Sequence, residues 1–389
     1  MKWMLLPTLL VGLVVGGSVE AVPSSTLSQA TTQPESQNKS KKIYLGSQYG
    51  FRFVYPANYS LDSATAYRAS DDPNLVQSIE IWKASEYSPL LYQSEPTGAE
   101  WPAHISIEVY ANPDKKPLEN WVSELKAGEV QVKTVAEQGA LAFASTGLYE
   151  YDNVILPIAD GRYVLKLQVG HLDATDPMRQ DFQALVNSLV LDDINPEGGL
   201  EHINYNRLRS LLNDQNWEAA DIETRMIMQL AMGSDYTYPH LSSQPNSLNQ
   251  VPCSQLQVLD ALWTEASNGR FGFSAQKRIW DAIKADTVQS RVEQFGNQVG
   301  WQQSPPANEG PLGGPWRADV GLNYSLSAPV GHLPWVGTSS AQLQDFLMQS
   351  GAGCGSCTID AIYISTDRFK DYLEDQFARL DQCPCTEPE

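Results

Sequence analysis

The chain is poor in basic residues for its acidic content: 26 Lys and Arg stand against 46 Asp and Glu, a formal net charge of −20. A surface this acidic repels phosphate backbones, so we exclude nucleic acid as a partner. Histidine and cysteine are also scarce, with five of each. No stretch of the sequence groups a nucleophile, a base and an orienting residue, and we therefore predict a protein that is not an enzyme.

Long hydrophobic runs are missing except at the start of the chain. Lys2 precedes an apolar run over residues 4–17, and residues 19–21 form a small-x-small cleavage pattern. The run is shorter than the roughly 20 residues that a permanent membrane helix needs. We expect residues 1–21 to be a signal peptide and the protein to be exported, to the periplasm or the thylakoid lumen. An uncleaved N-terminal anchor is the alternative.

Apolar periodicity is absent from residues 22–40, which are rich in Ser, Thr, Gln and Pro and predict a flexible linker. Residues 41–194 then alternate apolar and polar positions, as half-buried strands do. Asp160-Gly161 predicts a hairpin turn, and helices are expected near residues 118–125 and 177–189. The pattern indicates an α+β domain with helices on an antiparallel sheet. Its opening GFRFVYP and closing FQALVNSLV resemble the PsbP-like family.

The period becomes helical after residue 200, and residues 200–335 predict an all-α domain. Within it the signature segment, residues 267–280 (SNGRFGFSAQKRIW), is similar to the genomes-uncoupled-four family of porphyrin-binding regulators of chlorophyll synthesis. Three further pieces occur in family order, and together the four cover about 130 residues. They are YNRLRSLLNDQNWEAADIET, VPCSQLQVLDALW and, downstream, FGNQVGW with LNYSLSAPVGHLP.

The resemblance implies a binding function, with protoporphyrin IX or Mg-protoporphyrin as ligand and no obligatory cofactor. In the family the ligand lies on a cupped apolar surface between two loops. By position these are the first loop (residues 233–251) and the second loop (residues 300–335) of this chain. A porphyrin is a flat apolar disc with two carboxylates, so its site needs an apolar wall and a rim of cations or N–H groups. We expect the wall to contribute more binding energy than the rim.

The candidate ligand residues lie in the signature segment and the second loop: Arg270, Phe271, Phe273, Lys277, Arg278, Trp301, Tyr324, Leu326, His332, Leu333 and Trp335. A helix that begins at Ser274 would add free N–H groups. Phe271 and Phe273 could instead be core residues. His332 could face a metal or could be a hydrogen-bonded structural histidine.

Four of the five cysteines lie in an acidic extension, residues 336–389: Cys354, Cys357, Cys383 and Cys385. We expect disulfides that join one pair to the other, because a ring closed between Cys383 and Cys385 would be small and strained. A four-thiolate zinc site and a Cys-x-x-Cys redox role are the alternatives. We expect Cys253, at a helix start, to be buried and free.

Two functional hypotheses follow. The first is an exported, non-enzymatic tetrapyrrole-binding protein of an oxygenic phototroph such as a cyanobacterium; magnesium chelatase would be a partner only without export. The second is an assembly factor for a photosynthetic membrane complex with a degenerate ligand site. The first loop lacks the acidic, tryptophan-containing run of the family, and residues 304–315 add a Pro/Gly-rich stretch to the second loop, which motivates the second hypothesis.

Overall fold

A computed structural model describes residues 41–64, 72–85, 102–125, 127–195, 200–232, 251–302, 316–317, 319–335 and 373–383. The predictions for the signal peptide, the linker, nearly all of the first loop, the 304–315 stretch and three cysteines (Cys354, Cys357 and Cys385) lie outside these residues. Among the residues that are described, no helix has the length and apolar character that crossing a membrane requires.

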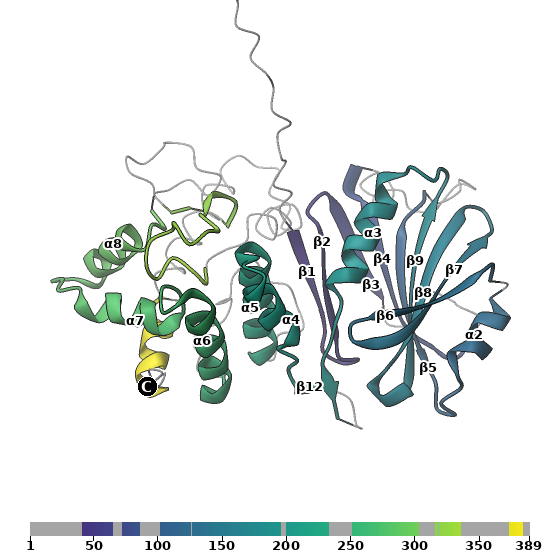
Figure 1. The fold of residues 1–389 in the computed structure, drawn as a ribbon, viewed down its shortest axis with the longest axis horizontal. Helices are drawn as coiled ribbons and strands as arrows, with labels where there is room; N and C mark the ends of the chain where they lie inside the picture. Colours follow the sequence, from purple (N-terminus) through teal and green to yellow (C-terminus); the bar gives the residue numbers. More distant parts are fainter. Residues whose placement is uncertain are drawn as a thin grey trace, which may run out of the picture. The chain divides into compact units, whose positions relative to one another are not determined.

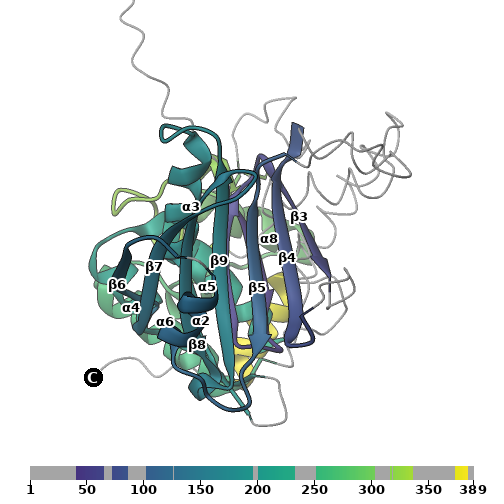
Figure 2. The ribbon, with the colours of Figure 1, turned by 90° about the vertical axis from the view of Figure 1, so that its right-hand side faces the viewer.

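An antiparallel seven-stranded sheet forms most of the N-terminal region, in the order β3-β4-β5-β9-β8-β7-β6 (Figure 2). Its strands are β3 (Tyr59–Ala64), β4 (Leu75–Lys83), β5 (Ile105–Ala111), β6 (Val130–Val135), β7 (Gln138–Thr146), β8 (Glu150–Ile158) and β9 (Tyr163–His171). The turn that the sequence predicted joins β8 to β9, with positive φ at Asp160 and Gly161. Successive side chains of these strands point to opposite faces of the sheet, so the alternating apolar residues line one face.

Each face of the sheet is covered by a helix. Helix α3 (Pro177–Ser188) buries Phe182 and Leu185 in the larger core, which also contains Ile105 and Ile107 of β5. Asp176 caps this helix by accepting from the Met178 N–H at 2.9 Å. Helix α2 (Leu118–Glu124) lies on the other face over a small cluster (Figure 2), in which Val122, Leu141, Phe143, Ile155 and Val164 are buried.

A short three-stranded sheet, ordered β1-β2-β10, lies against both the sheet core and the helical core. Its strands are β1 (Lys41–Gly46), β2 (Phe51–Pro56) and β10 (Val190–Leu191). Phe51 and Phe53 of β2 belong to the core of the seven-stranded sheet, whereas Val54 packs against the core of the helices. Successive side chains of a strand point to opposite faces, so one strand serves two cores. A two-stranded ribbon, β11 (Asp193–Ile194) with β12 (Leu200–His202), follows.

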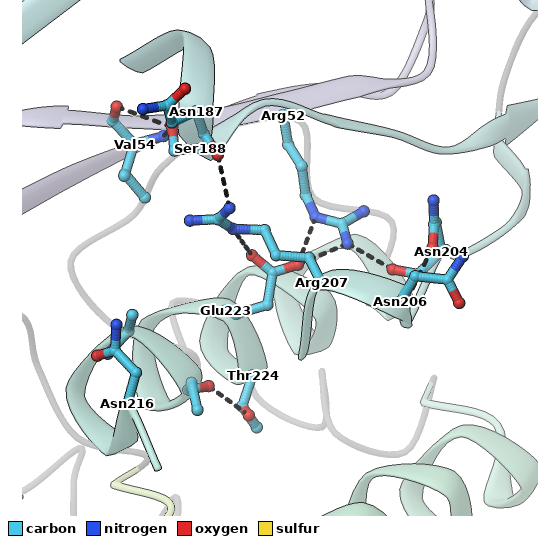
Figure 3. A network of polar contacts seen from close by, with 12 residues as sticks. Arg52, Val54, Asn187, Ser188, Asn204, Asn206, Arg207, Asn216, Glu223 and Thr224 are labelled. Carbon is cyan, nitrogen blue, oxygen red and sulfur yellow. Dashed lines mark hydrogen bonds and ion pairs between the residues drawn. The ribbon is translucent and has the colours of Figure 1, made fainter. Parts of the chain in front are cut away.

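A buried ion cluster joins β2 to the helices (Figure 3). Arg52 donates to the Glu223 carboxylate at 2.7 Å and to the Asn204 carbonyl at 2.8 Å, and it also contacts the Asp192 carboxylate. Burial lowers the pKa of Arg52, but the Glu223 and Asp192 carboxylates raise it overall. Arg207 approaches the second oxygen of Glu223 at 3.5 Å. Each buried charge thus has a partner of opposite sign.

The C-terminal region is helical (Figure 1). Its helices are α4 (Asn206–Asn213), α5 (Trp217–Ala231), α6 (Cys253–Ser267), α7 (Phe273–Ala282), α8 (Val288–Gln298) and a helical segment over residues 373–382. Helix α5 is buried on nearly all sides, including its charged residues Asp221, Glu223 and Arg225. An antiparallel sheet with helices followed by a helical region is the fold class that the sequence predicted. The predicted domain boundaries stay predictions.

Candidate functional site

The signature segment forms a tight link between α6 and α7 rather than an open anion site. Gly272 has a φ of 113° and is the N-cap of α7. The Ser274 N–H, which we expected to be free for a ligand carboxylate, donates to the Asp260 carboxylate of α6 at 2.7 Å. The helix also begins at Phe273 rather than at Ser274. The Ser274 N–H is therefore not free for a ligand, because an internal carboxylate already accepts it.

Backbone and side-chain hydrogen bonds from the signature segment hold the second loop. The Gly272 N–H donates to the Leu333 carbonyl at 3.0 Å, and the Gly331 N–H donates back to the Arg270 carbonyl at 2.8 Å. The Arg270 side chain donates to the Ala328 carbonyl, from Nε at 2.9 Å. Arg270 therefore organises the loop backbone, a role that its charge alone did not predict.

Gln276 is a central polar contact of this site. It is completely buried on α7, and its Nε2 donates to the carbonyls of Gly331 at 3.1 Å and Pro334 at 2.8 Å. Two carbonyls of one loop are thereby satisfied by one amide, which fixes their separation. Sequence reasoning missed Gln276, because a glutamine on a helix is usually a surface residue.

Aromatic side chains form the buried base of the second loop. The Trp301 ring lies edge-on to Phe295 at 5.4 Å and to Trp335 at 5.1 Å between centroids. The Trp301 Nε1 donates to the His332 carbonyl at 2.7 Å. Phe271, Phe273, Trp301, Leu333 and Trp335 are all buried in the core of the helices. These five candidates pack in the core that supports the loop. Their contact with a ligand stays a prediction.

His332 uses both ring nitrogens in hydrogen bonds to backbone groups. Its Nε2 accepts from the Asn323 N–H at 3.0 Å, which leaves Nδ1 to donate to the Val299 carbonyl at 2.6 Å. Burial lowers the pKa of His332. The arrangement suits a neutral histidine that ties the two ends of the loop together, the structural alternative left open by the sequence.

Two apolar side chains of the second loop are exposed to solvent. Leu326 is 41% exposed and Val330 is 44% exposed. Tyr324 is half-buried, and its hydroxyl donates to the Asp319 carbonyl at 3.1 Å. Burial raises the pKa of Tyr324 well above its usual value, so this hydroxyl stays a donor. Exposed apolar side chains on a hydrogen-bonded loop are contacts that a flat apolar ligand can use.

Buried charges on α5 anchor the loop from below. The Asp221 carboxylate accepts the Trp335 N–H and pairs with Arg225 at 3.1 Å, and Asp319 lies 4.0 Å from Arg225. Burial raises the pKa of Asp221 to about 7, against the opposing effect of Arg225. The sequence placed Asp221 and Arg225 on a helix without indicating that both are buried.

The other two predicted rim cations lie on α7. The Lys277 ammonium pairs with Asp281 and, at 2.8 Å, with Asp381 of the 373–382 helical segment. Arg278 is exposed, and its guanidinium is 3.4 Å from the Gly269 carbonyl. Lys277 is therefore engaged with carboxylates of the chain itself, and Arg278 is the more exposed cation.

The cysteine predictions need correction. Cys383 is joined in a disulfide to Cys253, with Cα atoms 5.1 Å apart. Cys253 is therefore not free, and Cys383 is bonded neither to Cys354 nor to Cys357. A four-thiolate zinc site that includes Cys383 is excluded as well. The pairing spans 130 residues, so the spacing of neighbouring cysteines did not reveal it.

Comparisons with known proteins found similarity over the part of the chain that contains the second loop. The family model described as GUN4-like matches residues 200–350. A Ycf53-like protein of Synechocystis is 31% identical over 144 residues, which cover 36% of this chain and 54% of the relative. The chloroplastic tetrapyrrole-binding protein of Arabidopsis thaliana is 32% identical over 84 residues, covering 20% and 29%. The chain spans about half the length of several curated relatives that it matches.

Two solved structures extend the comparison. The structure of GUN4 from Chlamydomonas reinhardtii has 27% sequence identity, covers 41% of this chain and 94% of that chain, and gives a TM-score of 0.26. The solution structure of cyanobacterial PsbP from Synechocystis has 10% identity, covers 42% of this chain and 98% of that chain, and gives a TM-score of 0.28. Residues 200–350, which match the GUN4-like family model, include the second loop and the helices that hold it.

Proposed function

We propose that the chain is a non-enzymatic tetrapyrrole-binding protein that takes protoporphyrin IX or Mg-protoporphyrin on its second loop. The observation that carries the proposal is the GUN4-like match over the residues that build this loop. The name of the Arabidopsis relative, a tetrapyrrole-binding protein, supports the ligand class. Leu326 and Val330 supply exposed apolar contacts, and the bonds from Arg270 and Gln276 keep the loop in place before a ligand arrives.

The balance of forces favours the apolar face of the ligand. Burying one porphyrin face of roughly 150–200 Å² against apolar side chains such as Leu326 contributes about 4–5 kcal/mol before the costs of association. An exposed ion pair between Arg278 and a propionate contributes at most about 1 kcal/mol. Apolar contacts should therefore dominate the affinity, while the cation orients the disc.

A titration of the full chain with protoporphyrin IX tests the proposal. We expect saturable binding, seen as a Soret shift and tryptophan quenching, with a Kd below about 100 μM, or about −5.5 kcal/mol. Leu326→Asp should weaken binding about tenfold or more, and more than Arg278→Ala does. Val258→Asp is the matched control, because Val258 is 38% exposed and belongs to α6 rather than to the second loop. No saturable binding by the unaltered chain would refute the proposal.

Binding without catalysis has its own test. After prolonged incubation with Mg-protoporphyrin, the recovered pigment should keep its mass and absorption spectrum. A new tetrapyrrole product that depends on the amount of protein would show an enzyme instead.

We propose further that the protein is exported to the periplasm or the thylakoid lumen. The Cys253–Cys383 disulfide supports an oxidising compartment, because disulfides are rare in reducing ones. Intact mass of protein from its native cells should give a chain that begins near Val22 and retains the disulfide. A chain that keeps Met1 or Lys2, with Cys253 and Cys383 reduced, would contradict export and would restore magnesium chelatase as a partner class.

Export also defines the partner class that we propose, a photosynthetic membrane complex. Purification of a tagged chain from membranes tests this, with pigment measured in the same sample. A complex that co-purifies with a pigment-free chain would favour the role of an assembly factor over that of a tetrapyrrole carrier.

A further inference from the structure

The helical segment of residues 373–382 is an internal partner for the GUN4-like helices, although it lies outside the residues that match the family. Leu373, Phe377 and Leu380 are buried in the helical core. The Phe377 ring stacks on Trp280 with centroids 4.4 Å apart and lies edge-on to Phe295 at 5.1 Å. The segment therefore covers α7 and α8 with an aromatic contact.

Polar contacts and one covalent bond attach the end of the segment. The Arg379 guanidinium donates to the Val251 carbonyl at 2.7 Å, directly before α6. Asp381 pairs with Lys277 of α7 at 2.8 Å. Cys383 closes the attachment through its disulfide to Cys253, the first residue of α6. Cys253 is partly exposed, whereas Cys383 is buried.

Contacts continue from this segment to the second loop. The Gln376 amide donates to Gln276 Oε1 at 3.1 Å, and the Gln276 amide donates to the carbonyls of Gly331 and Pro334. A second route is aromatic, since Phe377 contacts Phe295, which contacts Trp301. The segment and the loop thus share one buried glutamine and one aromatic cluster.

We propose that the Cys253–Cys383 disulfide is a redox-controlled strap that holds the 373–382 segment on α7 and thereby sets the rigidity of the second loop. The inference deepens the proposed function, because it assigns regulation to the tetrapyrrole site. A segment of this length is too short to be a stable helix by itself, so it depends on its attachment. Reduction leaves only noncovalent contacts to hold it.

The chemistry of the switch is thiol–disulfide exchange with a dithiol reductant. A reductant thiolate attacks the sulfur of Cys253, the more exposed residue, and the Cys253–Cys383 bond breaks. The Cys383 sulfur leaves as a thiolate and takes a proton from water. The second reductant thiol then displaces Cys253, so the reductant becomes a disulfide and the chain gains two electrons and two protons.

The first experiment measures, without any ligand, how the disulfide affects the mobility of the 373–382 segment and of the second loop. Hydrogen exchange is measured on the full chain in two peptides, residues 329–335 and residues 373–383. The oxidised chain is compared with the chain reduced by dithiothreitol, and peptide masses confirm whether the disulfide is present. Reduction and the variants Cys253→Ser and Cys383→Ser should each speed exchange about tenfold or more in both peptides. Cys385→Ser is the matched control, because it leaves the pair intact, and it should match the oxidised chain. An unchanged 329–335 peptide would overturn the proposal.

A second variant isolates the glutamine contact. Gln376→Ala keeps the disulfide and removes the donor to Gln276. Reduction of this variant should still speed hydrogen exchange in the 373–383 peptide. The increase in exchange of the 329–335 peptide should be smaller than in the unaltered chain. An equal response of the loop in the variant and the unaltered chain would overturn the role of Gln276.

Protoporphyrin IX titrations of the oxidised and reduced chain complete the test. The Kd should be about fivefold or more weaker for the reduced chain, in the range of typical coupling. Equal affinities in the two states would overturn control of the site by the strap. If neither state binds porphyrin while exchange responds to reduction, the tetrapyrrole function fails and the mechanical strap is supported.

Discussion

At the scale of single residues, Asp221 has the most unusual environment in the site. Its carboxylate is fully buried on α5, where it pairs with Arg225 and accepts a hydrogen bond from the Trp335 N–H. Burial raises its pKa to about 7. The folded chain therefore holds a proton between about pH 4 and pH 7 that the unfolded chain releases, and the free energy of unfolding falls as the pH rises through this range.

Asp221→Asn should remove this dependence while keeping an oxygen for the Trp335 N–H. Relative to the variant, the unaltered chain should lose about 2 kcal/mol of unfolding free energy between about pH 5 and pH 7. Urea unfolding at the two pH values measures the difference. Asp214→Asn, at an exposed position after α4, is the control and should follow the unaltered chain. Identical slopes for Asp221→Asn and the unaltered chain would contradict the buried acid.

Gly272 shows how one glycine determines the geometry of the signature segment. Its φ is 113°, and a Cβ there would lie 2.7 Å from the Asp260 oxygen that caps α7. Gly272→Ala should lower the free energy of unfolding by about 2–3 kcal/mol more than Gly269→Ala. Gly269 is the matched control, since it also has positive φ but nothing lies near its added Cβ. Chemical denaturation measures both variants. An equal loss of unfolding free energy in Gly272→Ala and Gly269→Ala would show that only backbone strain, and not the contact with Asp260, acts at Gly272.

At the scale of elements, the second loop and the 373–382 segment depend on contacts with α7. The signature segment was expected to bind the ligand directly, yet its polar groups bond to the loop and its aromatic residues lie in the core. Lys277 bonds to the C-terminal segment. One helix thus positions two elements that follow it far along the sequence.

Phe377→Ala tests the packing of the C-terminal segment. The ring is buried against Trp280 and Phe295, so its removal leaves a cavity and should destabilise the helical region by about 3–5 kcal/mol. Thermal unfolding followed by far-ultraviolet circular dichroism measures the loss. Ala378→Ser, at an exposed position of the same segment, should change the stability by less than about 0.5 kcal/mol. A small loss for Phe377→Ala would mean that the segment is not part of the core.

At the scale of the whole molecule, strand β2 connects the sheet to the helices. Phe51 and Phe53 complete the sheet core, while Arg52 lies between them in sequence and reaches Glu223 of α5. Removing either Arg52 or Glu223 should lower the free energy of unfolding, because a buried charge would lose its partner. We therefore expect the described sheet and helices to unfold together.

Arg52→Ala should break this coupling. The variant should lose about 3–5 kcal/mol, because the buried Asp192 and Glu223 carboxylates lose Arg52 and Glu223 keeps only the longer 3.5 Å contact with Arg207. Calorimetry should show one transition for the unaltered chain and a broadened or double transition for the variant. Arg209→Ala, at an exposed position on α4, should keep a single transition. A single transition at nearly the original temperature for Arg52→Ala would contradict coupling through this cluster.

The sequence by itself determined the features that depend on neighbours along the chain. Period-two alternation predicted strands such as β5, the Asp160-Gly161 pair predicted the turn before β9, and the helical period marked α5 through α8. The signature segment also placed the GUN4-like similarity correctly. These features are local because backbone dihedrals and side-chain periodicity repeat within a few residues.

Only the tertiary structure decided which distant groups meet. The partners of Arg52, the burial of Asp221, the loop contacts of Gln276 and the Cys253–Cys383 bond all join residues that are tens of positions or more apart. The same residue types are common on protein surfaces, where they would make other contacts. Their roles follow from burial, which makes an unpaired polar group costly and so selects one partner among many.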